Sequence, residues 1–315
     1  MRSRGLGDTI AKATKAVGIK PCGGCKKRQR RLNQWFPYKQ GAMDIVIPLA
    51  SGYHGRKKLG SKWENNELRY ALRSLQQYFP NMGRVFIVTE VLPEWLTNVV
   101  HLFAKDEHRS NKDANLIDKV LLACKSGVSD TFIRMSDDQC LLSKWDGQGI
   151  WHRGDRDSFR DILQSNKWWK RFDKTCQHLE AHGRPCFFYD CHCPIQVDRK
   201  EFIRIAEEAD YATLPGMCIN TLYCNSVEIP REKLNGQKLD VHQRAGPNKL
   251  EMLTKDKLFL GYSHIGTNQW MKEFLQQRFP EHSRFEEDIS SQSRDVLERM
   301  RRGPRTRGPR RRQAT

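Results

Sequence analysis

A chain of 315 residues, of which 38% are hydrophobic, is long enough to bury one large core or two small ones. It contains no run of eighteen apolar residues, which argues against a membrane-spanning helix and against membrane association. The N-terminus is basic but lacks the continuous apolar stretch of a secretory signal, so we expect a cytoplasmic protein whose ten cysteines are mostly reduced.

The positive charge is concentrated at the two ends of the chain. Of the net +18, residues 1–40 contribute +10, from eleven Lys or Arg against one Asp, and residues 301–315 contribute +7, all from Arg, which leaves +1 for the remainder. Such ends are typical of arms that bind a polyanion, with DNA or RNA the first candidate. The alternative is a pair of solvated tails that bind polyanions only weakly. We expect a basic arm over 1–40, a folded domain over 41–290 and an Arg-rich tail over 291–315.

The first half of the folded domain alternates short apolar strands with amphipathic helices. Its clearest helix contains Leu68, Leu72, Leu75 and Phe79, whose offsets of four, seven and eleven residues place them on one face. The predicted elements, in chain order, are a strand over 43–50, a helix over 63–79, strands over 83–90 and 98–104, a helix over 112–127 and a strand over 130–136. This order favours an α/β sheet with crossover helices, in which ligands bind at the carboxyl ends of the strands.

The second half is less regular. We expect helices over 166–183, 198–211 and 268–279, and strands over 220–229 and 257–263.

Two adjacent carboxylates, Asp137 and Asp138, follow the strand over 130–136 directly. Like charges at that distance repel, and burial makes the repulsion worse. Either a divalent cation that bridges them to a diphosphate or simple exposure in a turn would resolve the conflict. On spacing alone both interpretations stay open.

Four segments, in order over about residues 44–286, resemble the Stealth family of capsular-polysaccharide phosphotransferases. "ELRYALRSLQQYFPNMGRVFIVTEVLPEWL" resembles a helix-strand block of that family, and "MSDDQ" is similar to its Asn-Asp-Asp motif, with Ser136 in place of Asn. "CHCPIQVDRKEF" resembles its H-x-P segment through His192 and Pro194, and "FLQQRFPEHSRFE" resembles its final element.

The resemblance implies a GT-A-like nucleotide-sugar-binding fold with a divalent ion, Mn²⁺ or Mg²⁺, held by carboxylates, and a UDP-sugar as donor. It implies Asp138 as metal ligand, with Asp137 near the ribose or a metal-bound water, and we expect His264 to complete the metal shell. One departure is that "IPLASGY" lacks the acidic turn that follows the family's first strand. We therefore expect transfer of the sugar itself rather than of a sugar phosphate.

Four further residues are candidates for the nucleotide-sugar site. Asp44 begins the first strand and is either a nucleotide contact or an exposed acid at the strand start. Arg69 and Lys119 lie on the two helices that flank the strand tips, where each would pair with phosphate or form a surface salt bridge. Asn115 is either a hydrogen-bond partner for the nucleotide or sugar or a residue of the helix start.

Asp190 and His192 are the candidate catalytic residues. A histidine beside a carboxylate suits a general base that deprotonates an acceptor hydroxyl, and Asp190 could itself be that base. The competing interpretation is a structural histidine in the turn before Pro194. Cys22 and Cys25 have zinc-knuckle spacing, but zinc needs four ligands, and we expect these thiols to be free.

These observations favour a metal-dependent glycosyltransferase acting on a polyanionic acceptor, most specifically a hydroxymethylated base in DNA. The segment "GLGDTIAKATKAVGIKPCGGCKKRQRRLN" resembles a leader of phage-encoded proteins, which would place the enzyme in a host cytoplasm. The alternatives are a Stealth-type sugar-phosphate or polysaccharide transferase and a nucleic-acid-binding protein on an inactive transferase fold.

Overall fold

The computed structural model describes residues 41–50, 66–108, 110–159, 167–229, 232–241, 247–262 and 268–287, together with isolated positions before residue 41. The predicted C-terminal tail, nearly all of the N-terminal arm and the predicted ligand His264 lie outside these residues. Within the described part of the chain, no helix combines the length and the apolar character needed to cross a membrane.

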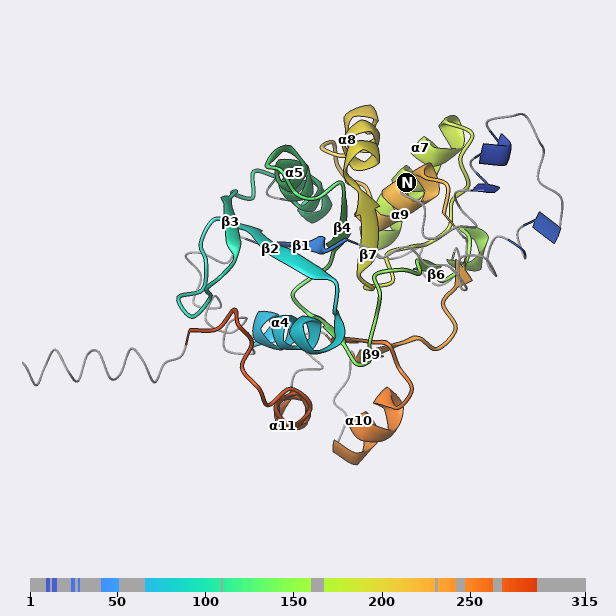
Figure 1. Cartoon of the computed structure of the whole chain (residues 1–315). Coiled ribbons are helices and arrows are strands. Elements are labelled where there is room, and N and C mark those ends of the chain that lie inside the picture. The colour runs from blue at the N-terminus through green and yellow to red at the C-terminus, as the bar shows by residue number, and fades with distance from the viewer. Residues whose placement is uncertain are drawn as a thin grey trace, which may run out of the picture.

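The centre of the fold is a five-stranded sheet in which four neighbouring strands run parallel (Figure 1). The order is β3-β2-β1-β4-β7, and β7 pairs antiparallel with β4 at one edge. The strands are β1 (Met43–Pro48), β2 (Met82–Thr89), β3 (Val100–Phe103), β4 (Thr131–Arg134) and β7 (Ile195–Asp198). The predicted α/β sheet with crossover helices is confirmed, and β7 is an addition to the four predicted strands.

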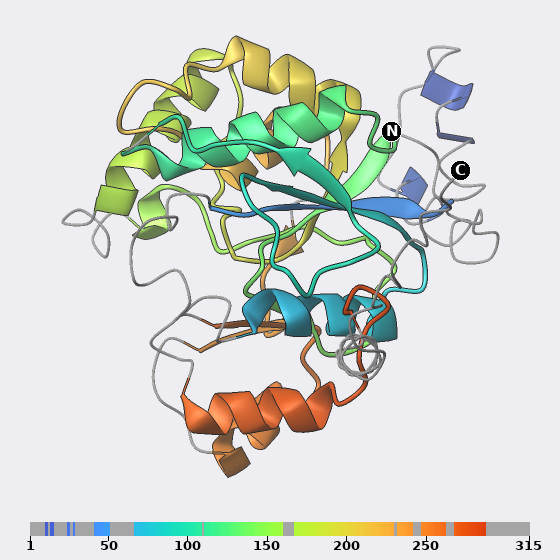
Figure 2. The ribbon, with the colours of Figure 1, turned by 90° about the vertical axis from the view of Figure 1, so that its left-hand side faces the viewer.

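Helices cover both faces of this sheet (Figure 2). α4 (Glu67–Tyr78) lies on one face and α5 (Lys112–Lys125) lies on the other. The side chains of β1 alternate between them, because Val46 packs in the apolar cluster of α5 whereas Ile45 and Ile47 pack in the cluster of α4. A parallel strand buried on both faces is expected to be apolar where helices cover it, which explains the apolar run from Ile45 to Leu49 after Asp44.

Three more helices lie on the α5 side of the sheet (Figure 2). They are α7 (Lys167–Ala181), α8 (Arg199–Glu208) and α9 (Ile219–Ser226). A disulfide between Cys176 and Cys186 joins α7 to the segment that leads to Asp190. Six other buried cysteines of the described residues form no disulfide: Cys124, Cys140, Cys191, Cys193, Cys218 and Cys224.

A smaller three-stranded sheet packs on the outer side of α4, with two helices beyond it (Figure 2). Its order is β5-β10-β9, and the Ser74 hydroxyl of α4 accepts a hydrogen bond from the Leu141 amide of β5 at 3.0 Å. The elements of this layer are β5 (Gln139–Leu141), β9 (Lys238–Val241), β10 (Phe259–Tyr262), α10 (Pro247–Thr254) and α11 (Gln269–Arg278). The remaining elements are a short parallel strand pair, β6 (Trp151–His152) with β8 (Glu232–Lys233), and a 3-10 turn over Asp157–Phe159.

The predicted strand over 220–229 is wrong, because residues 219–226 form the helix α9. The apolar residues of this segment follow neither the spacing of a strand nor that of a helix. The interaction that favours the helix comes from a distant part of the chain. The Asp190 carboxylate accepts hydrogen bonds from the amides of Asn220 and Thr221, at 3.3 and 3.1 Å, which caps the N-terminus of α9.

Candidate active site

The order of the parallel strands reverses between β1 and β4, because the chain connections run to opposite sides of this point. The chain leaves β1 through α4 to β2 on one side, and it returns from β3 through α5 to β4 on the other side. In open α/β sheets such a switch point opens a crevice at the carboxyl ends of the two strands, and ligands bind there. The region around the end of β4 is therefore the candidate site.

Asp137 and Asp138 form the turn that follows β4 at this point and leads into β5. Both residues are half-buried. The Asp138 carbonyl accepts a hydrogen bond from the Tyr262 amide of β10 at 3.4 Å, and the Gln139 side-chain oxygen accepts one from the Ser136 amide at 3.0 Å. The acidic turn is thus held between the main sheet and the small sheet.

Arg134, the last residue of β4, supplies a cation beside these acids that the sequence analysis missed. Its side chain is buried, at 5% exposure, and its Nη1 donates to the Asn220 Oδ1 at 3.1 Å. Burial lowers the pKa of Arg134, and the charges of Asp190, Asp113 and Asp138 oppose that shift. Its Nε has no hydrogen-bond partner among the described residues. A guanidinium in this position offsets part of the repulsion between the carboxylates.

Asp113, in the first turn of α5, forms an ion pair with Arg171 of α7, and its charge also acts on Arg134. Burial raises the pKa of Asp113, and the Arg171 charge and hydrogen bond oppose the rise. The sequence gives one local indication of Asp113, which is an acid in the first turn of a capped helix. It does not reveal the partner Arg171, because tertiary packing brings this residue of α7 to Asp113.

Asp190 lies against the N-terminus of α9, where the Thr221 hydroxyl also donates to it at 2.6 Å. Burial raises the pKa of Asp190, and the Thr221 hydrogen bond opposes the rise. His192 is exposed and has a φ of 51°, in the left-handed region that few non-glycine residues adopt. The Asp190 carboxylate is directed at α9, and the role of the two residues as base stays a prediction.

The predicted phosphate and nucleotide contacts of Lys119 and Asn115 are not supported, because the protein itself uses their polar groups. The buried Lys119 ammonium donates to the Leu49 carbonyl at the end of β1 and pairs with Asp106 after β3. The Asn115 side chain accepts from the His108 amide and donates to the His108 carbonyl, both at 2.9 Å. The two residues lie at the carboxyl edge of the sheet, and their part in nucleotide binding stays a prediction.

Arg69 is also engaged elsewhere. It forms an ion pair with Glu286 and stacks over the Trp95 ring with its guanidinium carbon 4.2 Å from the centroid. The structure thus contains a salt bridge, although Glu286 is buried and the pair does not lie on the surface as the alternative expected.

Asp44 lies at the amino edge of the sheet, opposite to Asp138, so a nucleotide contact does not fit its position. Its carboxylate accepts from the Arg84 amide at 2.9 Å, from Arg84 Nη2 at 2.7 Å and from the Ser129 amide at 2.9 Å. Burial acts to raise the pKa of Asp44, but the hydrogen bonds from Arg84 and Ser129 outweigh it and hold the pKa below its usual value. Asp44 is a structural carboxylate.

The donor set at the acidic turn suits one mode of metal binding. Among the residues that the structure describes, no group of three or more His, Cys, Asp or Glu side chains has the geometry to hold a metal ion. Asp137 and Asp138 offer two carboxylates at a half-buried turn, and the Asp138 Oδ1 is itself buried. Mg²⁺ and Mn²⁺ are commonly held by one or two carboxylates, with water and substrate phosphates completing the shell, and the acidic turn fits that mode.

Comparison with known proteins gives loose structural likenesses and nothing closer. No family model matches the chain, so the resemblance to the Stealth family stays a prediction. No curated protein matches it either.

Three solved structures illustrate the likeness. The galactosyltransferase LgtC with donor and acceptor sugar analogues aligns at a TM-score of 0.43 and 12% identity, over 79% of this chain and 99% of that one. An active-site variant of LgtC aligns at 0.38 and 12%, over 75% and 95%. The apo form of the glycosyltransferase GlyE of Streptococcus pneumoniae TIGR4 aligns at 0.38 and 10%, over 82% and 64%. Likenesses at this level do not decide an activity, and the function must be inferred from the residues of the chain itself.

Proposed function

We propose that the protein is a glycosyltransferase that moves a sugar from a nucleotide-sugar donor to an acceptor hydroxyl. The observation that carries the proposal is the position of Asp137 and Asp138, on a turn at the carboxyl end of β4 and beside the switch point of a parallel sheet. A crevice at that point is where such sheets bind nucleotides, and a pair of carboxylates there suits a diphosphate bound through a cation.

In this proposal Asp138 holds Mn²⁺ or Mg²⁺, and Asp137 contacts the ribose or a water on the ion. When bound, the ion neutralises charge on the departing diphosphate. His264, two residues beyond Tyr262, is proposed as the second protein ligand of the ion. Its backbone neighbour Tyr262 donates to the Asp138 carbonyl, which brings the chain close to the acidic turn before it enters residues outside the described part.

Asp190 is proposed as the general base. The acceptor oxygen attacks the anomeric carbon of the donor, the bond from that carbon to the phosphate oxygen breaks, and the nucleoside diphosphate leaves with the bonding electrons. The acceptor proton passes to the Asp190 carboxylate, or to His192 if that imidazole faces the acceptor. A carboxylate whose pKa is raised by burial is a stronger base than an exposed one, which supports the assignment to Asp190.

The acceptor is proposed to be a hydroxymethylated base in DNA. The basis is the division of charge, since the two ends of the chain carry +17 of the net +18 and the remainder is nearly neutral. Basic arms of this kind bind DNA by releasing its counterions. An enzyme that glycosylates a base must extrude it from the helix, which requires an acceptor space beside the acidic turn.

The test is to incubate the protein with labelled UDP-sugars and Mn²⁺, and with DNA that contains either hydroxymethylated or unmodified bases. We expect release of UDP and transfer of label to the modified DNA alone. Release of UMP would indicate sugar-phosphate transfer instead, and label in a capsule oligosaccharide would indicate the polysaccharide alternative. A protein that neither hydrolyses the donor nor gains thermal stability from it would be a binding protein on an inactive fold.

The role of the arms is tested separately, by measuring DNA binding as a function of salt. Deletion of residues 1–40 and 301–315 should abolish salt-sensitive DNA binding while leaving slow hydrolysis of the donor intact. Equal DNA binding by the shortened chain would contradict the proposed use of the arms without affecting the transferase proposal.

A further inference from the structure

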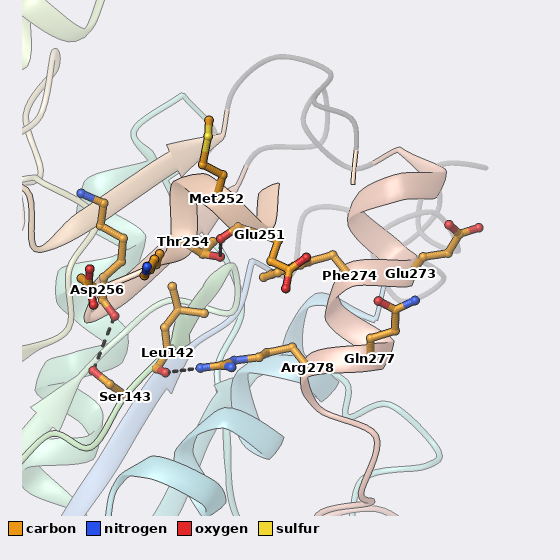
Figure 3. A pocket seen from close by; sticks show the side chains of 12 residues that line it. Leu142, Ser143, Glu251, Met252, Thr254, Asp256, Glu273, Phe274, Gln277 and Arg278 are labelled. Atoms are coloured by element: carbon orange, nitrogen blue, oxygen red, sulfur yellow. Dashed lines mark hydrogen bonds between the residues drawn. The ribbon is translucent and has the colours of Figure 1, made fainter. Parts of the chain in front are cut away.

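A groove of about 1300 Å³ lies at the end of the small sheet, between α10 and α11 (Figure 3). Its floor includes Leu142 and Ser143, which follow β5, and its walls come from the two helices. The groove and the candidate active site lie at opposite ends of the antiparallel strand pair β5–β10. At the groove end the Leu142 amide donates to the Leu258 carbonyl, and at the other end the Tyr262 amide donates to the Asp138 carbonyl.

The charged side chains around the groove balance one another. Three are acidic and three are basic: Glu251, Asp256, Glu273, Lys255, Lys257 and Arg278. Two of the cations are committed to the protein backbone, since Arg278 donates to the Leu142 carbonyl at 2.7 Å and Lys257 donates to the Gly236 carbonyl at 2.8 Å. The groove therefore has no net charge, and its acidic side chains would repel a phosphate backbone.

Several of the polar side chains that line the groove are exposed. Gln277, Glu251 and Lys255 line the groove and are exposed, and Gln277 follows the groove-lining Phe274 by three residues on α11. An amide, a carboxylate and an ammonium together offer both donors and acceptors, which is what a ligand rich in hydroxyl groups requires.

Apolar side chains form the second component of the surface. Met252 of α10 is 67% exposed and Phe274 of α11 is half-buried, and both line the groove. Trp270 is 47% exposed and precedes Phe274 by four residues on α11, so the two rings lie on the same face of that helix. Phe274 therefore offers an apolar ring within the groove, and Trp270, which lies outside the groove lining, offers a second ring one turn before it.

We propose that this groove binds a neutral oligosaccharide. Sugar rings present an apolar face, which packs on aromatic rings, and a rim of hydroxyls, which bond to amides and charged side chains. DNA does not fit the balanced charge, and a purely apolar partner does not fit the six ionised side chains. The site goes beyond the proposed transfer reaction and does not depend on it, because it lies at the opposite end of the small sheet from Asp138.

The proposal is tested by isothermal titration of the full chain with three neutral hexasaccharides: maltohexaose, cellohexaose and chitohexaose. We expect at least one to bind, and we expect Phe274→Ala and Trp270→Ala to weaken that binding about tenfold or more. Gln277→Ala should weaken it less. Phe103→Ser is the matched control, since Phe103 is an aromatic residue of β3 that is 61% exposed on the other layer, and it should bind as the wild type does.

Three results would overturn the proposal. One is no heat of binding for any of the three sugars at about 10 mM, where a millimolar complex is nearly saturated. The second is equal binding by the wild type and both aromatic variants. The third is dimerisation in sedimentation experiments that Trp270→Ala abolishes, which would make the groove a self-association face. Asp138→Asn should bind the sugar normally, so a failure of the transferase proposal can be told apart from a failure of this one.

Discussion

The two edges of the main sheet both carry aspartates beside an arginine, but the pairs are built differently. At the amino edge, Asp44 receives two amides and the Arg84 guanidinium. At the carboxyl edge, Arg134 is shared among Asp113, Asp138 and Asp190, and it donates to Asn220 instead of forming a bidentate pair with one of them.

The pKa values of the carboxyl groups follow this difference. Hydrogen bonds outweigh burial at Asp44 and hold its pKa below the usual value, whereas burial outweighs hydrogen bonds at Asp113 and Asp190 and raises theirs. The carboxyl groups around Arg134 share one buried cation, and we propose that this edge of the sheet, unlike the amino edge, is the functional one. Asp190 also accepts three hydrogen bonds from α9, so its raised pKa, and not a lack of donors, distinguishes it from Asp44.

The largest expected effect is at Asp138. Asp138→Asn removes one charge from the acidic turn with almost no change in shape, and we expect donor turnover to fall by about 10²–10³-fold, the usual cost of losing one preorganised electrostatic group. The fold should persist, because the contact of this residue with β10 is made by its carbonyl. Steady-state release of UDP, together with the thermal midpoint, measures both.

Asp146→Asn is the matched control for that variant. Asp146 is exposed in a turn, where its Oδ1 accepts from the Gln148 amide at 2.9 Å. Its replacement should leave turnover within about twofold of the wild type. Full activity in Asp138→Asn would contradict the assigned role of the carboxyl edge.

Glu286, like Asp44, is a carboxylate whose oxygens accept several hydrogen bonds from the protein. We expect its replacement to change the stability of the fold and not the activity. Its buried side chain accepts from Arg73 Nε at 2.7 Å and from the Ser283 amide at 2.9 Å, and it also pairs with Arg69. Burial acts to raise the pKa of Glu286, but these hydrogen bonds lower it from 4.5 to about 2. The stabilisation is therefore complete above about pH 4.5 and is lost as the pH falls toward 2.

The expected size is about 3 kcal/mol at neutral pH, at 1.36 kcal/mol for each pH unit between the two pKa values. Glu286→Gln should lower the free energy of unfolding by about this amount at pH 7, and the difference from the wild type should shrink as the pH approaches 2. Denaturant titrations at several pH values measure it. Glu281→Gln, at an exposed position on the same segment, should change stability by less than about 0.5 kcal/mol. A difference that stays constant with pH would show that ionisation of Glu286 is not the cause.

Asp190 provides a sharper test, because it both caps α9 and is proposed as the base. Asp190→Asn should lower kcat by about 100-fold if the carboxylate accepts the acceptor proton, and it should remove the fall in activity at low pH. A purely structural cap would cost about 1 kcal/mol of stability and leave the shape of the pH profile unchanged.

Thr221→Val refines the same test. The Thr221 hydroxyl donates to Asp190 and opposes the rise in its pKa, so its removal should move the acid limb of the pH profile to higher pH. An acid limb that does not move in this variant would mean that another group titrates, with His192 the next candidate.

The sequence predicts a structural feature correctly when the pattern that determines it lies within one segment of the chain. The four parallel strands and their two crossover helices are predicted correctly, because an apolar run or an apolar helical face is contained in each segment. The position of Asp137 and Asp138 at the end of β4 is predicted for the same reason, since the acids directly follow such a run. The helix α9 is missed because its cap, Asp190, lies about thirty residues earlier in the chain.

The same limit applies to the site residues. Arg69 and Lys119 are near the strand tips as expected, but their partners are set by packing, with Glu286 lying 217 positions after Arg69. Arg134, Asp113 and Asn220 have no shared motif, and they meet only when β4, α5 and α9 assemble. Charge and hydrogen-bond networks that join distant elements are therefore what the sequence alone does not reveal.

The smallest effect is expected at Asp44, and it tests the contrast between the edges most directly. Asp44→Asn keeps one acceptor oxygen for the amides but breaks the ion pair with Arg84, whose side chain is 56% exposed and therefore well screened. We expect a loss of about 1–2 kcal/mol in the free energy of unfolding, with kcat and KM for the donor within about twofold of the wild type. Gly83→Ala should act in the same direction, because an added Cβ would lie 2.7 Å from the Asp44 Oδ1 and push the carboxylate from its donors. A large rise in KM in either variant, at unchanged stability, would place the nucleotide at the amino edge and reverse the assignment of the two edges.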